Sequence, residues 1–152
     1  MKVLVCTDGS EQNKKTLEKA MQIAKGFNVN EVAIIHVDDE KIDFSAMPVG
    51  EGHVPTETEM NRLRKMQEEH KIERKKILND TLKQFEENNI KARAIYKEGH
   101  PSHTIVETAS EEGFDMIVIG SRGLSGFKKV LLGSVSGAVV QEANDCIVAV
   151  VK

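Results

Sequence analysis

Aromatic residues and cysteines are both scarce in this chain. Aromatic residues make up 4% of its 152 residues, which leaves few rings on which a flavin could stack. The two cysteines, Cys6 and Cys146, each lie in or beside a run of β-branched residues, where a small buried thiol is the usual occupant. Neither a flavin site nor a disulfide is therefore expected.

The chain also lacks long apolar runs and an excess of positive charge. Its longest apolar stretches are strand-length, and Met1 and Lys2 lead directly into one, so neither a membrane-spanning helix nor a signal peptide is predicted. The formal net charge of -3 disfavours a sequence-independent nucleic-acid surface. We expect a cytoplasmic protein with no membrane or nucleic-acid partner, folded as a single domain over residues 1–152.

Short β-branched runs alternate with segments of helical periodicity. The candidate strands are Lys2–Cys6, Glu31–Val37, Lys91–Tyr96, Asp115–Gly120 and Cys146–Val151. Helices are predicted between them, the first beginning at Ser10, the third near Pro101 and the fourth after Gly133. Strands separated by helices of this length imply right-handed βαβ units. The sequence therefore predicts a doubly wound α/β fold with a five-stranded parallel sheet, order 3-2-1-4-5, and helices on both faces.

The second helix is predicted to be the longest, from about Glu59 to Asn88. Its expected inward stripe consists of Met60, Leu63, Met66, Ile77, Thr81 and Phe85. The many Glu and Lys residues of this segment indicate a solvated face. The connection before it, residues 38–58, is long for a compact domain. Such a segment is usually a lid, a binding segment or disordered, and we expect it to be mobile without ligand and to close over the binding site as a lid, with plain disorder as the alternative.

Three glycines near the C-terminal end predict a phosphate site. Gly120 and Gly123 follow the fourth strand, and Gly133 with Ser134 opens the last helix. Glycine lets backbone N–H groups approach an anion without a Cβ atom, and a helix start directs its unpaired N–H groups and positive dipole end outward. Arg122 adds a positive charge. The spacing matches neither the Walker A nor the Rossmann pattern.

Two loops are expected to meet beside the middle strands. In the order 3-2-1-4-5 the switch point lies between the first and fourth strands, so Thr7 and Asp8 would face the glycines that begin at Gly120. Asp8 is then a candidate ligand for Mg²⁺ bound with a phosphate. A structural alternative remains open, because Asp8, Gly9 and Ser10 also form a good turn and helix start, with Ser10 as the N-cap.

These segments resemble the universal stress protein family over essentially the full length of the chain. The most specific likeness is Gly-x2-Gly-x9-Gly-Ser over residues 120–134, the pattern of the ATP-binding members. Residues 3–10, His36-Val37 and residues 98–101 support it. The resemblance implies a flavodoxin-like fold with ATP bound along strands 1, 2 and 4, and a homodimer formed through the last strand.

The resemblance also implies a role for individual residues. Thr7, Asp8 and Val37 would contact the nucleoside, with Val37 near adenine and Asp8 toward ribose or Mg²⁺. The phosphates would be held, mainly through main-chain N–H groups, by Gly120, Arg122, Gly123, Gly133, Ser134, Val135 and Ser136. Relatives often carry a proline where this chain has Cys6.

The leading hypothesis is a regulatory or stress-response protein that binds ATP, with AMP or ADP as the alternative ligands. A slow ATP-hydrolysing or adenylating enzyme of a related fold is the second hypothesis. The loop at Thr7–Ser10 departs from the Ser-Gly-Gly-x-Asp-Ser type of loop that the adenylating relatives need, and we assign no catalytic residue. A phosphorelay receiver is disfavoured because Asp8 stands without a second acid after the first strand.

Overall fold

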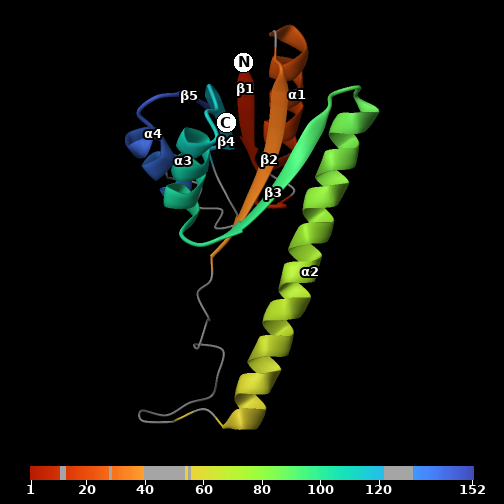
Figure 1. The fold of residues 1–152 in the computed structure, drawn as a ribbon, viewed down its shortest axis with the longest axis vertical. Helices are drawn as coiled ribbons and strands as arrows, with labels where there is room; N and C mark the ends of the chain where they lie inside the picture. The colour runs from red at the N-terminus through yellow and green to blue at the C-terminus, as the bar shows by residue number, and fades with distance from the viewer. Residues whose placement is uncertain (11–12, 28, 40–53, 55, 122–131) are drawn as a thin grey trace.

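The computed structural model describes residues 1–10, 13–27, 29–39, 54, 56–121 and 132–152. Strands and helices alternate along these residues (Figure 1). The elements are β1 (Lys2–Cys6), α1 (Lys14–Gly26), β2 (Glu31–Asp38), α2 (Glu57–Glu87), β3 (Ala92–Glu98), α3 (Pro101–Glu111), β4 (Met116–Gly120), α4 (Ser134–Glu142) and β5 (Ile147–Val151). No helix within these ranges is both long and apolar enough to span a membrane.

The five strands form one parallel sheet in the order β3-β2-β1-β4-β5, which confirms the predicted flavodoxin-like topology. β1 lies at the centre, where Leu4 is in register with Ala33 of β2 and with Ile117 of β4. All three of these side chains are fully buried. Strands covered on both faces bury every side chain, which explains their continuous apolar sequences.

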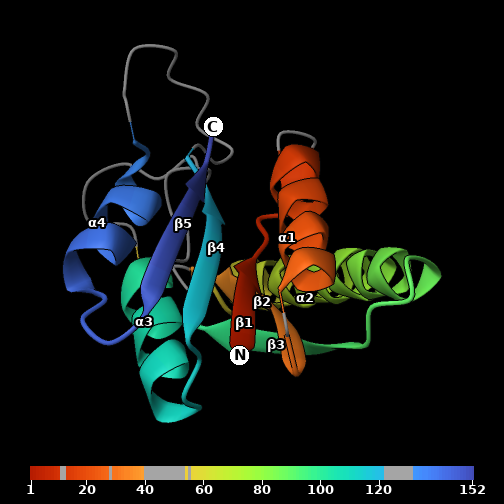
Figure 2. The same cartoon turned by 90° about the horizontal axis from the view of Figure 1, so that it is seen from above.

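Helices cover both faces of the sheet, as the sequence predicts. α1 and α2 lie on one face and α3 and α4 on the other (Figure 2). Because successive strand residues point to opposite faces, Val3 and Val5 pack with α1 and α2, whereas Leu4 packs with α3 and α4. Phe85 of α2 is the largest side chain that is completely buried on its face.

The predicted inward stripe of α2 is wrong at Met66, and Met60 and Leu63 before it are only half-buried. Thr81 and Phe85 are buried as predicted, together with Leu78, but Met66 is 47% exposed. At about 1.5 Å per residue the 31 residues of α2 extend about 46 Å, whereas the 8 residues of β2 extend about 26 Å. The first half of α2 therefore projects past the carboxyl end of β2 (Figure 1).

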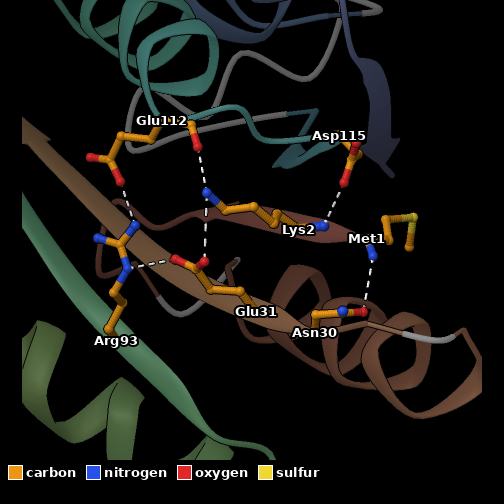
Figure 3. Close-up of polar contacts among 7 residues, drawn as sticks. All are labelled: Met1, Lys2, Asn30, Glu31, Arg93, Glu112 and Asp115. Carbon is orange, nitrogen blue, oxygen red and sulfur yellow. Dashed lines mark hydrogen bonds and ion pairs between the residues drawn. The ribbon is translucent and has the colours of Figure 1, made fainter.

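Charged side chains join the strands at the opposite, amino-terminal edge of the sheet (Figure 3). Arg93 of β3 pairs with Glu31 of β2 and with Glu112 at the end of α3. Lys2 of β1 pairs with Glu31 at 3.5 Å, and its backbone N–H donates to Asp115. The Arg93 hydrogen bond is the main cause that holds the pKa of Glu31 below its usual range. This network stabilises the edge that lies farthest from the candidate site.

Candidate functional site

A cavity of about 440 Å³ opens at the carboxyl ends of β1, β2 and β4. Its volume lies within the range of small-molecule sites. Eight of the ten residues that the sequence predicts for nucleotide binding line it: Thr7, Asp8, Val37, Gly120, Gly133, Ser134, Val135 and Ser136. The other two, Arg122 and Gly123, lie outside the described residues, as does most of the predicted lid, residues 40–53 and 55.

Thr7, directly after β1, is fixed by its neighbours on three sides. Its backbone N–H donates to the carbonyl of Ile35 at 2.9 Å. Its hydroxyl oxygen accepts hydrogen bonds from the side-chain amide of Asn13 at 2.6 Å and from the backbone N–H of Gly9 at 3.2 Å. A hydroxyl that accepts two bonds still has its own proton to donate. Thr7 therefore presents a positioned donor to the cavity.

His36 of β2 holds the same loop from the other side. Its Nδ1 lies 2.9 Å from the carbonyl oxygen of Thr7, and a carbonyl only accepts, so Nδ1 carries the proton. Burial lowers the pKa of His36, and this favours the neutral ring. The ring stacks on Tyr96 with 6.1 Å between centroids. In this tautomer Nε2 is an unprotonated acceptor, and His36 is one of the residues that line the cavity.

Asp8 forms a local turn that changes the expected start of the first helix. One carboxylate oxygen accepts from the backbone N–H of Ser10 at 2.9 Å and from its hydroxyl at 2.7 Å. The prediction that Ser10 is the N-cap of α1 is therefore wrong. Asn13 precedes the first helical residue. The bonds of Ser10 to Asp8 compete with helix capping. No described residue binds the second oxygen of Asp8, so that atom remains available to a ligand.

The first turn of α4 presents backbone donors to the cavity. Gly133 is the N-cap, its N–H donates to the carbonyl of Ser121 at 2.8 Å, and the first helical bond runs from Gly137 to Gly133. Within the part of the chain that the structure describes, no group accepts from the N–H groups of Ser134, Val135 or Ser136. Unpaired donors at a helix start, with the positive end of the dipole, form an anion-binding arrangement.

The floor of the cavity is apolar. Cys6, Ile35, Ile105 and Ile119 contribute to it. Burial raises the pKa of the Cys6 thiol far above its ordinary value, so this cysteine stays protonated at neutral pH. Cys146 is a free thiol outside this lining. An apolar floor beside a few positioned donors is typical of a site for a flat organic ring.

The polar residues that sequence reasoning did not place in this site include Asn13, His36 and Arg74, and Asp38 and Asp39 also line the cavity. Asn13 was not considered because the first helix was predicted to begin at Ser10, which placed Asn13 inside the helix. Its side-chain amide donates a hydrogen bond to Thr7. His36 was noted beside Val37 but not as a partner of Thr7. Arg74 lines the cavity from α2, 36 residues after Asp38 along the chain. No local signal marks Arg74, because its place depends on where the long helix crosses the edge of the sheet.

A parallel sheet in this order, with a cavity at the carboxyl ends of its middle strands, defines a flavodoxin-like α/β protein with a cavity at the switch point, where proteins of this architecture usually bind ligands. The family model described as "Universal stress protein family" matches residues 1–152. This chain therefore belongs to the universal stress protein family.

Several relatives match over nearly the whole chain. Universal stress protein YxiE of Bacillus subtilis is 36% identical over 99% of this chain and 98% of its own length. Universal stress protein MJ0577 of Methanocaldococcus jannaschii is 33% identical in sequence, and its solved structure superposes with a TM-score of 0.77 over 99% of this chain and 96% of that chain. An Archaeoglobus fulgidus universal stress protein solved in complex with dAMP has a TM-score of 0.65 at 22% identity, covering 100% of this chain and 98% of that chain.

Proposed function

We propose that this protein binds an adenine nucleotide, with ATP as the first candidate, and acts as a regulatory protein of the stress response in the cytoplasm. The observation that carries the proposal is that the start of α4, whose first N–H groups have no acceptor among the described residues, lines one cavity with Thr7, Asp8 and Val37. The dAMP in the Archaeoglobus fulgidus relative is consistent with a site for adenine nucleotides on this fold.

The phosphates are assigned to the start of α4 and the glycine motif. The assigned residues are Gly120, Arg122, Gly123, Gly133, Ser134, Val135 and Ser136. Gly133 has φ of -67°, a value that any residue adopts, so its backbone conformation does not require glycine. Close approach of a ligand gives a reason for glycine at this position.

The nucleoside is assigned to the ends of β1 and β2. The Thr7 hydroxyl is a donor, and the backbone of Val37 with the apolar floor suits adenine. Asp8 has one oxygen that no described residue engages, and such an oxygen suits either a ribose hydroxyl or Mg²⁺ shared with phosphates. A bound Mg²⁺ would neutralise part of the phosphate charge.

Substitution of Gly133 by valine is expected to weaken ATP binding at least about tenfold, roughly 1.4 kcal/mol. The new side chain would occupy the space assigned to a phosphate oxygen, while φ of -67° accommodates it without backbone strain. Isothermal titration calorimetry measures the affinity. Gly26→Val is the matched control, since a Cβ at Gly26 meets no atom within 4 Å and Gly26 lies outside the cavity lining. Equal ATP affinities for both variants and the wild type would remove the phosphate assignment.

Replacement of Asp8 by asparagine is expected to lower ATP affinity mainly when Mg²⁺ is present. The amide oxygen still accepts from Ser10, so the turn after β1 is retained, but the charge that attracts a cation is lost. Titrations with Mg²⁺ and with EDTA separate the two contributions. A loss of the same size under both conditions would assign Asp8 to ribose and reject its role with metal.

We also propose that β5 forms a homodimer interface. β5 is an edge strand, and Ile147 at its start is 58% exposed. Two copies paired about a twofold axis would close this edge. Val148 and Val150 pack toward α3 and α4, so a charge at either position would disturb the core as well as the edge. Ile147 provides the cleaner test.

The variant Ile147→Lys is expected to shift the equilibrium from dimer toward monomer. In a twofold dimer the substitution places two positive charges, one from each copy, beside the paired strands. Sedimentation velocity at tens of micromolar measures the shift. Phe27→Lys is the control, since Phe27 is a similarly exposed apolar residue after α1. A wild type that sediments as a monomer, or an Ile147→Lys variant as dimeric as the wild type, would exclude β5 as the interface.

A further inference from the structure

We propose that Arg74 of α2 contacts the nucleoside half of the bound nucleotide and so links the projecting helix to occupancy of the site. The inference rests on the proposed nucleotide binding and adds a specific residue to it. None of the sequence motifs assigned to the nucleotide includes α2.

Arg74 lies beside the loop that follows β1. A Cβ atom placed on Gly9 would be 3.8 Å from Nη1 of Arg74, so the guanidinium is next to the residue that follows Asp8. Arg74 is half-buried and lines the cavity together with Asp8 and His36. Its positive charge also contributes to the lowered pKa of His36.

Two neighbouring lysines of α2, Lys71 and Lys75, have partners, whereas Arg74 has none among the described residues. Lys71 pairs with Glu98 at 2.5 Å and lies 5.9 Å from the ring centroid of Tyr96. Lys75 lies 5.5 Å from the same centroid. No described residue makes a hydrogen bond or ion pair with Arg74. A half-buried guanidinium is stabilised when its fork of donors meets acceptors, and a ligand in the cavity would supply them.

The arrangement of the strands assigns Arg74 to the nucleoside. The start of α4 follows β4, whereas Arg74 lies toward the β1 and β2 side of the cavity, beside Gly9 and close enough to His36 to lower its pKa. At about 4.8 Å between neighbouring strands, the end of β2 is about 10 Å from the end of β4 along the edge of the sheet, and β1 lies between them. Phosphates at the start of α4 leave the ribose and adenine to extend across β1 toward β2. Ribose oxygens and purine ring nitrogens are acceptors for the Arg74 donors.

The backbone of α2 is held in place next to Arg74 by packing. A ligand bound to Arg74 would therefore also restrain the helix. Leu78 is buried in the core, and Ile77 lies against Gly9. The part of α2 that precedes Arg74 projects beyond the carboxyl end of β2 (Figure 1). A ligand held by Arg74 would therefore restrain the turn from which the projecting half of α2 begins.

Affinities for ATP, AMP and adenosine test the contact. Arg74→Met is expected to weaken all three by a similar factor, about tenfold, because all three contain the nucleoside. Lys76→Met removes the same charge two residues further on, from an exposed position outside the cavity lining, and is expected to bind like the wild type. Circular dichroism and urea unfolding of each variant verify that the fold is intact.

Hydrogen exchange gives a second readout that a purely structural role would not change. In the wild type, ATP is expected to slow exchange both at the start of α4 and in α2 around residues 71–78. In Arg74→Met at saturating ATP, the protection of α4 should persist and that of α2 should be lost.

Three results would overturn the inference. Unchanged affinities in Arg74→Met would exclude the contact. A loss of affinity that grows with the number of phosphates would mean that Arg74 contacts the phosphates and not the nucleoside. Protection of α2 that persists in the saturated variant would exclude the link to the helix. Each of these leaves nucleotide binding itself standing, whereas a wild type that binds none of the three ligands removes the proposed function and the inference together.

Discussion

Replacement of Phe85 by alanine is expected to lower the free energy of unfolding by about 3–5 kcal/mol, the largest effect of any substitution considered for this protein. Phe85 is 0% exposed and lies in the core between α2 and the sheet, where Val3, Val5 and Leu17 belong to the same cluster. Truncation removes a buried ring and leaves a cavity that rigid strands cannot fill. Urea unfolding followed by circular dichroism measures the change.

The control for this substitution is Met66→Ala on the same helix. Met66 is 47% exposed and lies in the half of α2 that projects from the sheet, so its loss is expected to change stability by no more than about 0.5 kcal/mol. Similar losses for the two variants would mean that the first half of α2 packs against the protein in solution. The described position of α2 would then be incorrect.

A second large effect is expected at Gly9, where alanine should destabilise the protein by about 2–4 kcal/mol. Gly9 has φ of +74°, a conformation unfavourable for alanine. The new Cβ would also lie 2.9 Å from Cγ2 of Ile77, too close for van der Waals contact. Because Gly9 follows Asp8 and donates to the Thr7 hydroxyl, nucleotide affinity is expected to fall together with stability.

Gly113→Ala separates the two causes of the Gly9 effect. Gly113 has φ of +66°, but a Cβ there meets no atom within 4 Å, so only the conformational cost of about 1–2 kcal/mol remains. Adding Ile77→Ala to Gly9→Ala should relieve the steric part of the penalty. Equal losses at Gly9 and Gly113 would contradict the described contact between the loop and α2. Urea unfolding of these three variants and the wild type decides between these outcomes.

The topology of the sheet was predictable because its signals are local. The strands β1, β4 and β5 are short, largely apolar runs, and β1 has the predicted bounds, Lys2–Cys6. Parallel strands joined by helices leave few arrangements, and the predicted order was the one observed. The same logic brought Asp8 and Gly133 to one cavity, because loops after neighbouring parallel strands meet at one edge.

The errors of prediction have a different origin. Helical periodicity marks the apolar face of α2 but does not tell where the sheet beneath it ends, so Met66 was assigned to a core that it does not reach. Ser10 has the chemistry of an N-cap, but the carboxylate of Asp8 engages it first. Arg74 reaches the cavity only through the packing of α2 across β2, a long-range arrangement that no short motif encodes.

The most direct test of nucleotide binding is mass spectrometry of the ligands that this protein selects. The purified protein would be equilibrated with Mg²⁺ and an equimolar mixture of ATP, GTP, CTP and UTP, separated from unbound nucleotide and then denatured. We predict that the released ligand is ATP, and that Gly133→Val treated in the same way releases much less of it. Release of no nucleotide, or of the four nucleotides in equal amounts, would contradict an adenine-nucleotide site in this cavity.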